Sequence, residues 1–114
     1  MKSLKDDYRT PGQDPLEKNT LVLKLERSQQ DVGQLRNKLN SYICEPKTYS
    51  LFERMEALKN GLDTLSNTNK EIILSIRQRK KHTVDFVDRV RQQFIAFNEL
   101  QRGVEEYMQG LRSY

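Results

Sequence analysis

The sequence predicts an all-α protein, an antiparallel helical hairpin with a long second helix that belongs to a coiled-coil or helical-bundle assembly. Two apolar seams with alternating spacings of four and three residues indicate helices, and a proline separates the two seams. Of the 114 residues, 35% are hydrophobic and 32% are charged, whereas average globular domains have roughly 45–50% and about 25%. Such a polar chain suits long helices that each bury one stripe.

The first predicted helix covers residues 14–44 and follows a loosely attached tail, residues 1–13, which has no apolar period. Asp14 offers an N-cap oxygen. Pro15 fits the first helical turn, because its missing N–H needs no partner there. The seam of this helix consists of Leu21, Leu25, Ser28, Val32, Leu35, Leu39 and Tyr42.

A turn over residues 45–50 and then one long helix over 51–113 are predicted next. Pro46 ends the first helix, because it lacks an N–H and disfavours helical backbone in the residue before it. Ser50 and Glu53 have the spacing of a capping box, which marks a new helix start. From there the seam runs through nineteen positions without a change of phase, and fifteen of them are apolar or aromatic. We therefore expect a continuous helix.

A three-helix bundle is the alternative architecture. Asn60-Gly61 can end a helix and residues 68–71 can cap another, which would split the long helix in two. Gly61 lies off the seam, however, where it costs only about 1 kcal/mol relative to Ala. A break also does not normally preserve the heptad phase on both sides. The hairpin is therefore preferred, with room for a kink at this point.

The two predicted helices differ in length, about 44 Å and about 95 Å at 1.5 Å per residue, so the first covers only part of the second. The seam continues beyond the covered part, and an exposed apolar stripe of that size is rare on monomers. The sequence therefore predicts a surface that binds other helical subunits. The predicted partner-binding residues are Phe86, Val90, Phe94, Phe97, Leu100, Val104, Tyr107 and Leu111.

Polar residues inside the seam bear on the type of assembly. Two identical parallel strands would set Arg79 against Arg79, a buried like-charge contact, whereas a different chain can supply an acid. We therefore expect a hetero-oligomer and keep a homodimer as the alternative. Asn69 is expected to define register and strand number, as a lone seam Asn commonly does.

The net charge of +4 comes from one basic cluster, Arg77, Arg79, Lys80 and Lys81, because the rest of the chain is balanced. A cluster of this kind can bind nucleic acid, an anionic membrane face or the acidic surface of a filament. It lies within the seam, unlike the basic region of a bZIP protein, which precedes its zipper. Polyanion binding is therefore the alternative function, and a solvated helix face is the simpler interpretation.

The sequence predicts no enzymatic activity and no catalytic, cofactor or metal site. It has one His, His82, and one Cys, Cys44, and neither belongs to a cluster with the three or four ligands that a metal needs. No Gly-rich phosphate loop is present in the sequence. The single cysteine, the charged N-terminal segment and the lack of an apolar run of about 18 residues predict an intracellular protein, cytoplasmic or nuclear, without a transmembrane segment.

The expected function is that of a non-enzymatic structural subunit that packs into a larger multi-protein complex. The layout of short helix, Pro-containing turn and longer helix resembles small helical subunits of kinetochore, dynactin-type and vesicle-tethering complexes. This architectural resemblance implies a scaffold role in a cytoskeletal, kinetochore or tethering assembly, without naming a partner. A SNARE-like layer pattern around Arg79 is a further interpretation of the same seam.

Overall fold

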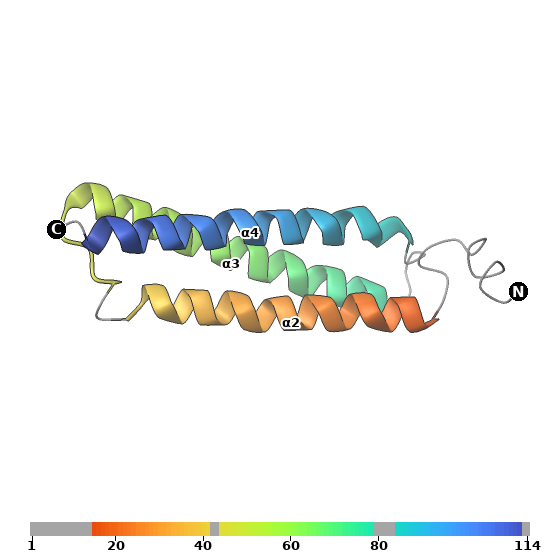
Figure 1. Cartoon of the computed structure of the whole chain (residues 1–114). Helices are drawn as coiled ribbons and strands as arrows, with labels where there is room; N and C mark the ends of the chain where they lie inside the picture. The colour runs from red at the N-terminus through yellow and green to blue at the C-terminus, as the bar shows by residue number, and fades with distance from the viewer. Residues whose placement is uncertain (1–14, 42–43, 79–83, 113–114) are drawn as a thin grey trace, which may run out of the picture.

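The described part of the chain is a bundle of three α-helices. The computed structural model describes residues 15–41, 44–78 and 84–112, and this part of the chain contains no strand. The helices, labelled as in Figure 1, are α2 (Pro15–Leu39), α3 (Tyr49–Arg77) and α4 (Val84–Arg112). α2 and α4 run in the same direction, and α3 runs antiparallel to both (Figure 1). The predicted all-α fold is confirmed.

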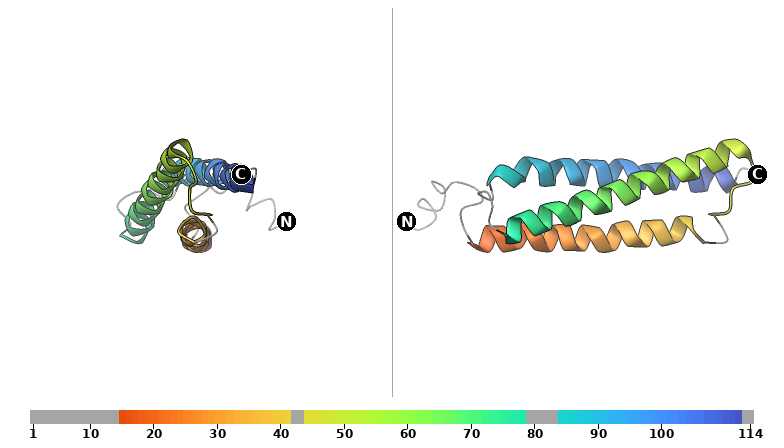
Figure 2. Two further views of the ribbon diagram at one scale, coloured as in Figure 1. Left: turned by 90° about the vertical axis from the view of Figure 1, so that its left-hand side faces the viewer. Right: turned by 180° about the vertical axis from the view of Figure 1, so that it is seen from behind.

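The three-helix alternative describes the architecture. In place of the single helix expected over 51–113, the structure has α3 and α4, which pack side by side in opposite directions (Figures 1 and 2). The break falls between Arg77 and Val84, whereas Asn60-Gly61, the position at which the sequence suggested a break, lies inside α3. The expectation of one continuous long helix is corrected accordingly.

Two features explain why the chain turns between α3 and α4. The seam positions Arg79 and Thr83 are polar, so a helix continued through them would gain little from burial. α3 ends with Arg77 in its last turn and with Gln78 as its C-cap, whose N–H donates to Leu74 O over 2.9 Å. A cation is favourable there, because the helix macrodipole places partial negative charge at this end. Folding back then covers the apolar stripe of α4 with α2 and α3.

α2 begins as predicted and ends earlier. Pro15 is its first residue, as expected of a proline in the first turn, whereas the predicted N-cap Asp14 and the tail over 1–13 lie outside the described residues. Beyond the helix end, the N–H and the hydroxyl of Ser41 both donate to Lys38 O, over 3.2 and 2.7 Å. Local bonds of this kind compete with continuation of a helix.

The cap of α3 is Thr48 and not Ser50. Thr48 has extended backbone, and its hydroxyl oxygen accepts a hydrogen bond from the N–H of Leu51 over 3.1 Å. The helix consequently begins at Tyr49, two residues before the predicted start. The predicted capping box of Ser50 and Glu53 is therefore wrong, although a Ser or Thr cap after Pro46 was the correct type of signal.

The core consists of two apolar clusters, each built from all three helices. α3 crosses the other two helices at an angle, as the end-on view in Figure 2 shows, so that it packs on both. The cluster at the end where α2 leads into α3 contains the buried residues Val32, Leu39, Cys44, Met55, Leu58, Leu62, Leu65, Val104 and Tyr107. The cluster at the opposite end contains Val22, Leu25, Ile72, Ile73, Ile76, Phe86 and Val90.

α3 and α4 approach each other closely where glycine takes the place of a side chain. A Cβ added to Gly61 would lie 2.7 Å from Leu100 Cδ2, and one added to Gly103 would lie 2.8 Å from Leu58 Cδ2. Both distances are shorter than van der Waals contact, so a larger residue at either position would require the leucine side chain to move. Gly61 is therefore a packing residue within α3.

Candidate protein-interaction site

A polar layer joins the three helices between the two apolar clusters. Asn69 of α3, which is 0% exposed, donates to Gln29 Oε1 of α2 over 3.0 Å and accepts from Gln93 Nε2 of α4 over 2.8 Å. Gln29 also donates to Ser66 Oγ over 3.1 Å, and Gln93 donates to Leu65 O over 3.2 Å. The amides satisfy one another within the chain, so this layer serves packing and register.

The predicted partner-binding stripe faces the interior of the bundle. Phe86, Val90, Val104 and Tyr107 are buried. Phe94, Phe97, Leu100 and Leu111 are partly buried against the two clusters. The expectation of an uncovered overhang is therefore wrong, because α4 lies on α2 and α3. Partner binding through these eight residues stays a prediction that would require the bundle to open.

Tyr107 and Cys44 meet where α4 packs on the connection between α2 and α3. The Tyr107 hydroxyl donates to Cys44 O over 2.7 Å, and both residues are buried. Burial raises the pKa of the Tyr107 hydroxyl above its ordinary value of 10.0, and the neighbouring Cys44 raises it further. Cys44 is a free, buried thiol. This pair holds a turn in place and offers no accessible nucleophile.

Arg77 is the member of the predicted basic cluster that the structure describes; Arg79, Lys80 and Lys81 lie outside the described residues. Arg77 Nη2 lies 2.7 Å from Glu26 Oε2, which links α3 to α2. Both side chains are about half exposed, so the pair contributes less than about 1 kcal/mol. Polyanion binding by the cluster stays a prediction.

Metal-binding clusters and membrane-spanning helices are both absent from the described part of the chain. No group of three or more His, Cys, Asp and Glu side chains there is arranged to hold a metal ion. None of the described helices is long and apolar enough to cross a membrane.

Large apolar side chains are exposed on the outer surface of the described helices. They are Leu23 (65% exposed), Tyr49 (75%), Phe52 (43%), Leu74 (56%) and Ile95 (48%). Four of the five form two pairs at opposite ends of the bundle, one in a groove between α2 and α3 and one at the start of α3. Neighbouring exposed apolar side chains indicate an interaction surface more strongly than single ones, which are normal on protein surfaces.

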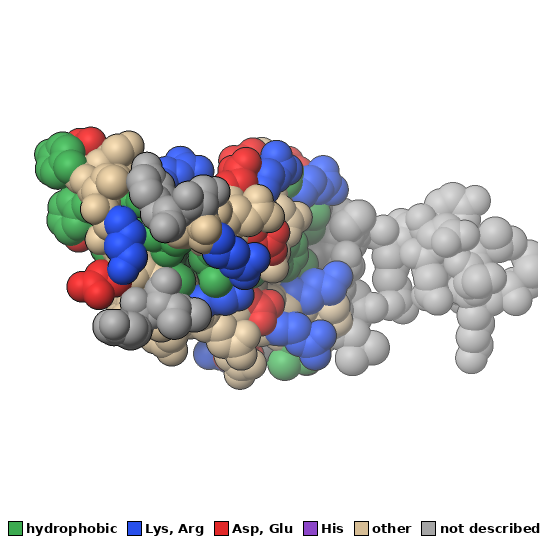
Figure 3. Space-filling model, turned by 60° about the vertical axis from the view of Figure 1, so that its left-hand side comes forward, with side chains coloured by type: hydrophobic (Ala, Val, Ile, Leu, Met, Phe, Trp, Pro, Cys, Tyr) green, Lys and Arg blue, Asp and Glu red, His purple; other side chains and the backbone are tan. Residues whose placement is uncertain are grey.

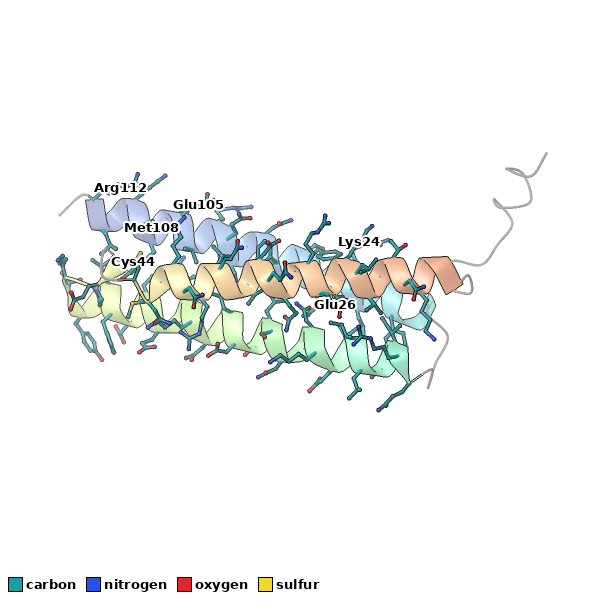
Figure 4. All side chains as sticks on the ribbon, turned by 90° about the horizontal axis from the view of Figure 1, so that it is seen from below. Lys24, Glu26, Cys44, Glu105, Met108 and Arg112 are labelled. Atoms are coloured by element: carbon teal, nitrogen blue, oxygen red, sulfur yellow. The ribbon has the colours of Figure 1, made fainter. Side chains whose placement is uncertain are left out.

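The first pair, Leu23 and Leu74, lies along the groove between α2 and α3, which we call the α2–α3 groove. Leu23 lines a hollow of about 440 Å³ and Leu74 lines one of about 470 Å³, and the two hollows share Glu26 and Arg77. Glu26 lies on the side of α2 that faces α3, whereas Lys24 lies on the opposite side, towards α4 (Figure 4). The groove therefore has apolar residues on either side of one ion pair.

The charged residues that line the α2–α3 groove are unbalanced. Among the described lining residues, Lys18, Lys70 and Arg77 are cations, and Glu26 is the single acid. Because Glu26 pairs with Arg77, the positive charge of the two lysines is left over. The groove therefore combines an apolar surface with a positive potential.

The second pair, Tyr49 and Phe52, lies in the first turn of α3. Their rings are stacked, with centroids 6.4 Å apart and an interplanar angle of 26°. Figure 3 brings this end of the bundle forward and shows apolar side chains on its surface among charged ones. Exposed aromatic residues of this kind are enriched at protein interfaces.

The sequence prediction included neither pair, because none of the four residues occupies a seam position or lies in the stretch from residue 86 to 111 that was expected to be uncovered. A signal was present. Leu23 lies two residues from Leu21 and from Leu25, and Leu74 lies two residues from Ile72 and from Ile76. Two residues correspond to about 200° around a helix, so an apolar residue midway between two seam residues points to the opposite, outer face.

No protein family model, no curated protein and no solved structure matches the chain. Inferences about function therefore rest on the geometry of the α2–α3 groove and of the Tyr49–Phe52 pair.

Proposed function

We propose that this chain is a non-enzymatic structural subunit that holds other protein chains in a larger complex through helix packing. The observation that supports this most strongly is the presence of exposed apolar pairs at both ends of the bundle, Leu23 with Leu74 and Tyr49 with Phe52. Full burial of one such side chain by a partner is worth about 1.5–3 kcal/mol. Two pairs offer two separate places for a partner.

The bundle between the two pairs suits a spacer. Phe52 and Leu74 lie on the same helix, so at 1.5 Å per residue they are separated by about 33 Å along α3. The polar layer and the two apolar clusters hold α2 and α4 against this helix. Partners bound at the two ends would be held at a defined separation.

The layout expected from the sequence favours different chains as partners, in a cytoskeletal, kinetochore or vesicle-tethering type of assembly within the cytoplasm or nucleus. A homodimer is the alternative. Either assembly can use the exposed pairs without opening the bundle. Association through the interior stripe of α4 would first have to overcome the burial of Phe86 and Val90.

The proposal is tested by isolating the tagged full chain from its own cells and measuring the mass of what elutes by size-exclusion chromatography with light scattering. We expect a complex well above the 13.5 kDa of one chain. Tyr49→Ser with Phe52→Ser, combined with Leu23→Ser and Leu74→Ser, should release the partners. Ile95→Ser, an exposed apolar residue outside both pairs, is the matched control and should retain the complex.

A wild-type chain that elutes as a monomer without a stoichiometric partner would contradict the proposal. A complex that survives all four serine substitutions would contradict the role of the two pairs. Circular dichroism of each variant shows whether the bundle itself has remained folded.

A further inference from the structure

We infer that the α2–α3 groove binds an amphipathic helix with an acidic face, supplied by another protein. This inference rests on the proposed function and names one surface and one class of partner. Polyanions such as nucleic acid or anionic lipid are the competing occupants, and the experiment below includes them.

The shape of the groove suits a helix. Its walls are two antiparallel helices, α2 and α3, and a further helix laid between them completes a four-helix arrangement. Val22 and Ile73 are at the margin of burial, at 8% and 9% exposure, while Leu23 and Leu74 project beyond them. An apolar stripe with spacings of three and four residues on the partner would contact this surface, as in other helix-in-groove complexes.

The charge of the groove selects an acidic partner. Lys18 lines the hollow next to Leu23, and Lys70 lines the hollow next to Leu74, so each apolar contact has a cation beside it. A helix with Glu or Asp flanking its apolar stripe would place a carboxylate near each lysine. A basic helix would meet repulsion at both positions.

The ion pair between Glu26 and Arg77 lies in the middle of the groove, shared by both hollows. Because it is half exposed and weak, a carboxylate of the partner can take the place of Glu26 beside Arg77. Glu26 then competes with the partner. Its neutralisation should strengthen binding, which is an effect that damage to the fold would not produce.

The experiment selects binders from a phage-displayed library of amphipathic helices with randomised charged positions, panned against the immobilised full-length chain. We expect the enriched helices to carry an apolar stripe and a net negative charge. The affinity of one enriched peptide is then measured by fluorescence anisotropy against wild type and variants.

Leu74→Ser should weaken that peptide about tenfold or more, the change expected for loss of one buried leucine contact. Lys70→Glu should weaken it about threefold, and a peptide in which Lys replaces Glu at the acidic positions should bind Lys70→Glu better than wild type. Glu26→Gln should tighten binding about threefold. Ile95→Ser, an exposed apolar position on α4, should leave the affinity unchanged.

The inference is overturned if no helix is enriched, if the enriched helices are neutral or basic, or if Leu74→Ser and Ile95→Ser have equal effects. It is also overturned if phosphatidylserine vesicles or duplex DNA, but no acidic peptide, bind in a manner that Leu74→Ser abolishes. The two proposals can fail separately. A chain that keeps its partners through Tyr49 and Phe52 after Leu74→Ser would contradict this inference and leave the proposed function standing, whereas a monomeric wild-type chain would contradict the proposed function.

Discussion

Asn69 is a polar side chain in an apolar core, and its value lies in the hydrogen bonds that it makes. Its amide group bonds to both Gln29 and Gln93, so each neighbouring helix contributes a partner. A different register would leave one of these amides buried and unpaired, at a cost of about 1–3 kcal/mol. Ser28, one helical position from Gln29, is buried without a hydrogen-bond partner for its hydroxyl among the described residues.

Asn69→Ala should lower the free energy of unfolding by about 1–3 kcal/mol, because Gln29 loses its donor and Gln93 loses one acceptor. Urea denaturation followed by circular dichroism measures this. Ser28→Ala is the control, and it should leave stability unchanged or raise it, since the hydroxyl of Ser28 has no hydrogen-bond partner among the described residues. Equal effects of the two substitutions would contradict a stabilising polar layer.

Tyr107→Phe should lower the free energy of unfolding by about 0.5–1.5 kcal/mol below pH 10, because the bond to Cys44 O is lost. The pKa of Tyr107 is raised in the folded state, so the folded state holds the phenol proton more tightly than the unfolded state. The stability that this supplies is fully present below the unfolded pKa of 10.0 and disappears as the pH rises through the folded pKa.

The measurement is urea denaturation of wild type and Tyr107→Phe from neutral pH into the alkaline range. The difference in the free energy of unfolding between the two proteins should become smaller above pH 10, because only the wild type has this tyrosine to ionise. A constant gap across that range would show that Tyr107 does not contribute to the alkaline loss of stability.

At the scale of the helices, the glycines distinguish a packed surface from an open one. Gly33 in α2 is exposed, and a Cβ there would have nothing within 4 Å, whereas a Cβ on Gly61 would meet Leu100. Both glycines lie within helices. The difference between them therefore comes from the neighbouring helix and not from local helix propensity.

Gly33→Ala should raise the free energy of unfolding by about 0.5–1 kcal/mol, since alanine loses less backbone entropy in a helix. Gly61→Ala should leave the free energy of unfolding unchanged or lower it, because the Leu100 side chain must move to make room. Thermal unfolding of the two variants and wild type makes the comparison. An equal gain for both variants would mean that α3 and α4 are not packed closely at Gly61.

The helix boundaries show which local signals were reliable. Pro15 and Pro46 correctly predicted a helix start and the connection that follows α2, because proline restricts the backbone whatever surrounds it. The cap of α3 is Thr48 and not the predicted Ser50. Both residues have a side-chain hydroxyl that can cap a helix, so the local sequence does not distinguish between them. The starts of α2 and α3 were therefore predicted to within a few residues, whereas the end of α3 at Arg77 was not predicted.

At the scale of the whole molecule, the three described helices share their buried clusters. Phe86 of α4 is 3% exposed and packs in a cluster with Val22 of α2 and Ile72 of α3. The interior face of α4 is thus part of the same core as the other two helices. A change in this face should destabilise all three helices together.

Phe86→Ala should lower the free energy of unfolding by about 3–5 kcal/mol, the usual cost of removing a buried aromatic ring. Ile95→Ala on the exposed face of α4, where the side chain is 48% exposed, should cost less than about 1 kcal/mol. Chemical denaturation monitored at the helical circular dichroism signal measures both. Similar small costs for the two variants would indicate that α4 is not docked on the bundle.

The sequence by itself determined that the chain is helical, near which residues α2 and α3 begin and which face of each helix is apolar, because helical period, proline and capping residues act over a few neighbouring positions. It could not decide whether the stripe of α4 meets a partner or the same chain, since a continuous helix and a helix folded back show the same alternation of four and three residues. The fold decided this by burying Phe86 and Val90 against α2 and α3. The α2–α3 groove also exists only in the folded molecule, because its two hollows, which share Glu26 and Arg77, are lined by residues that only the antiparallel packing of two helices brings together.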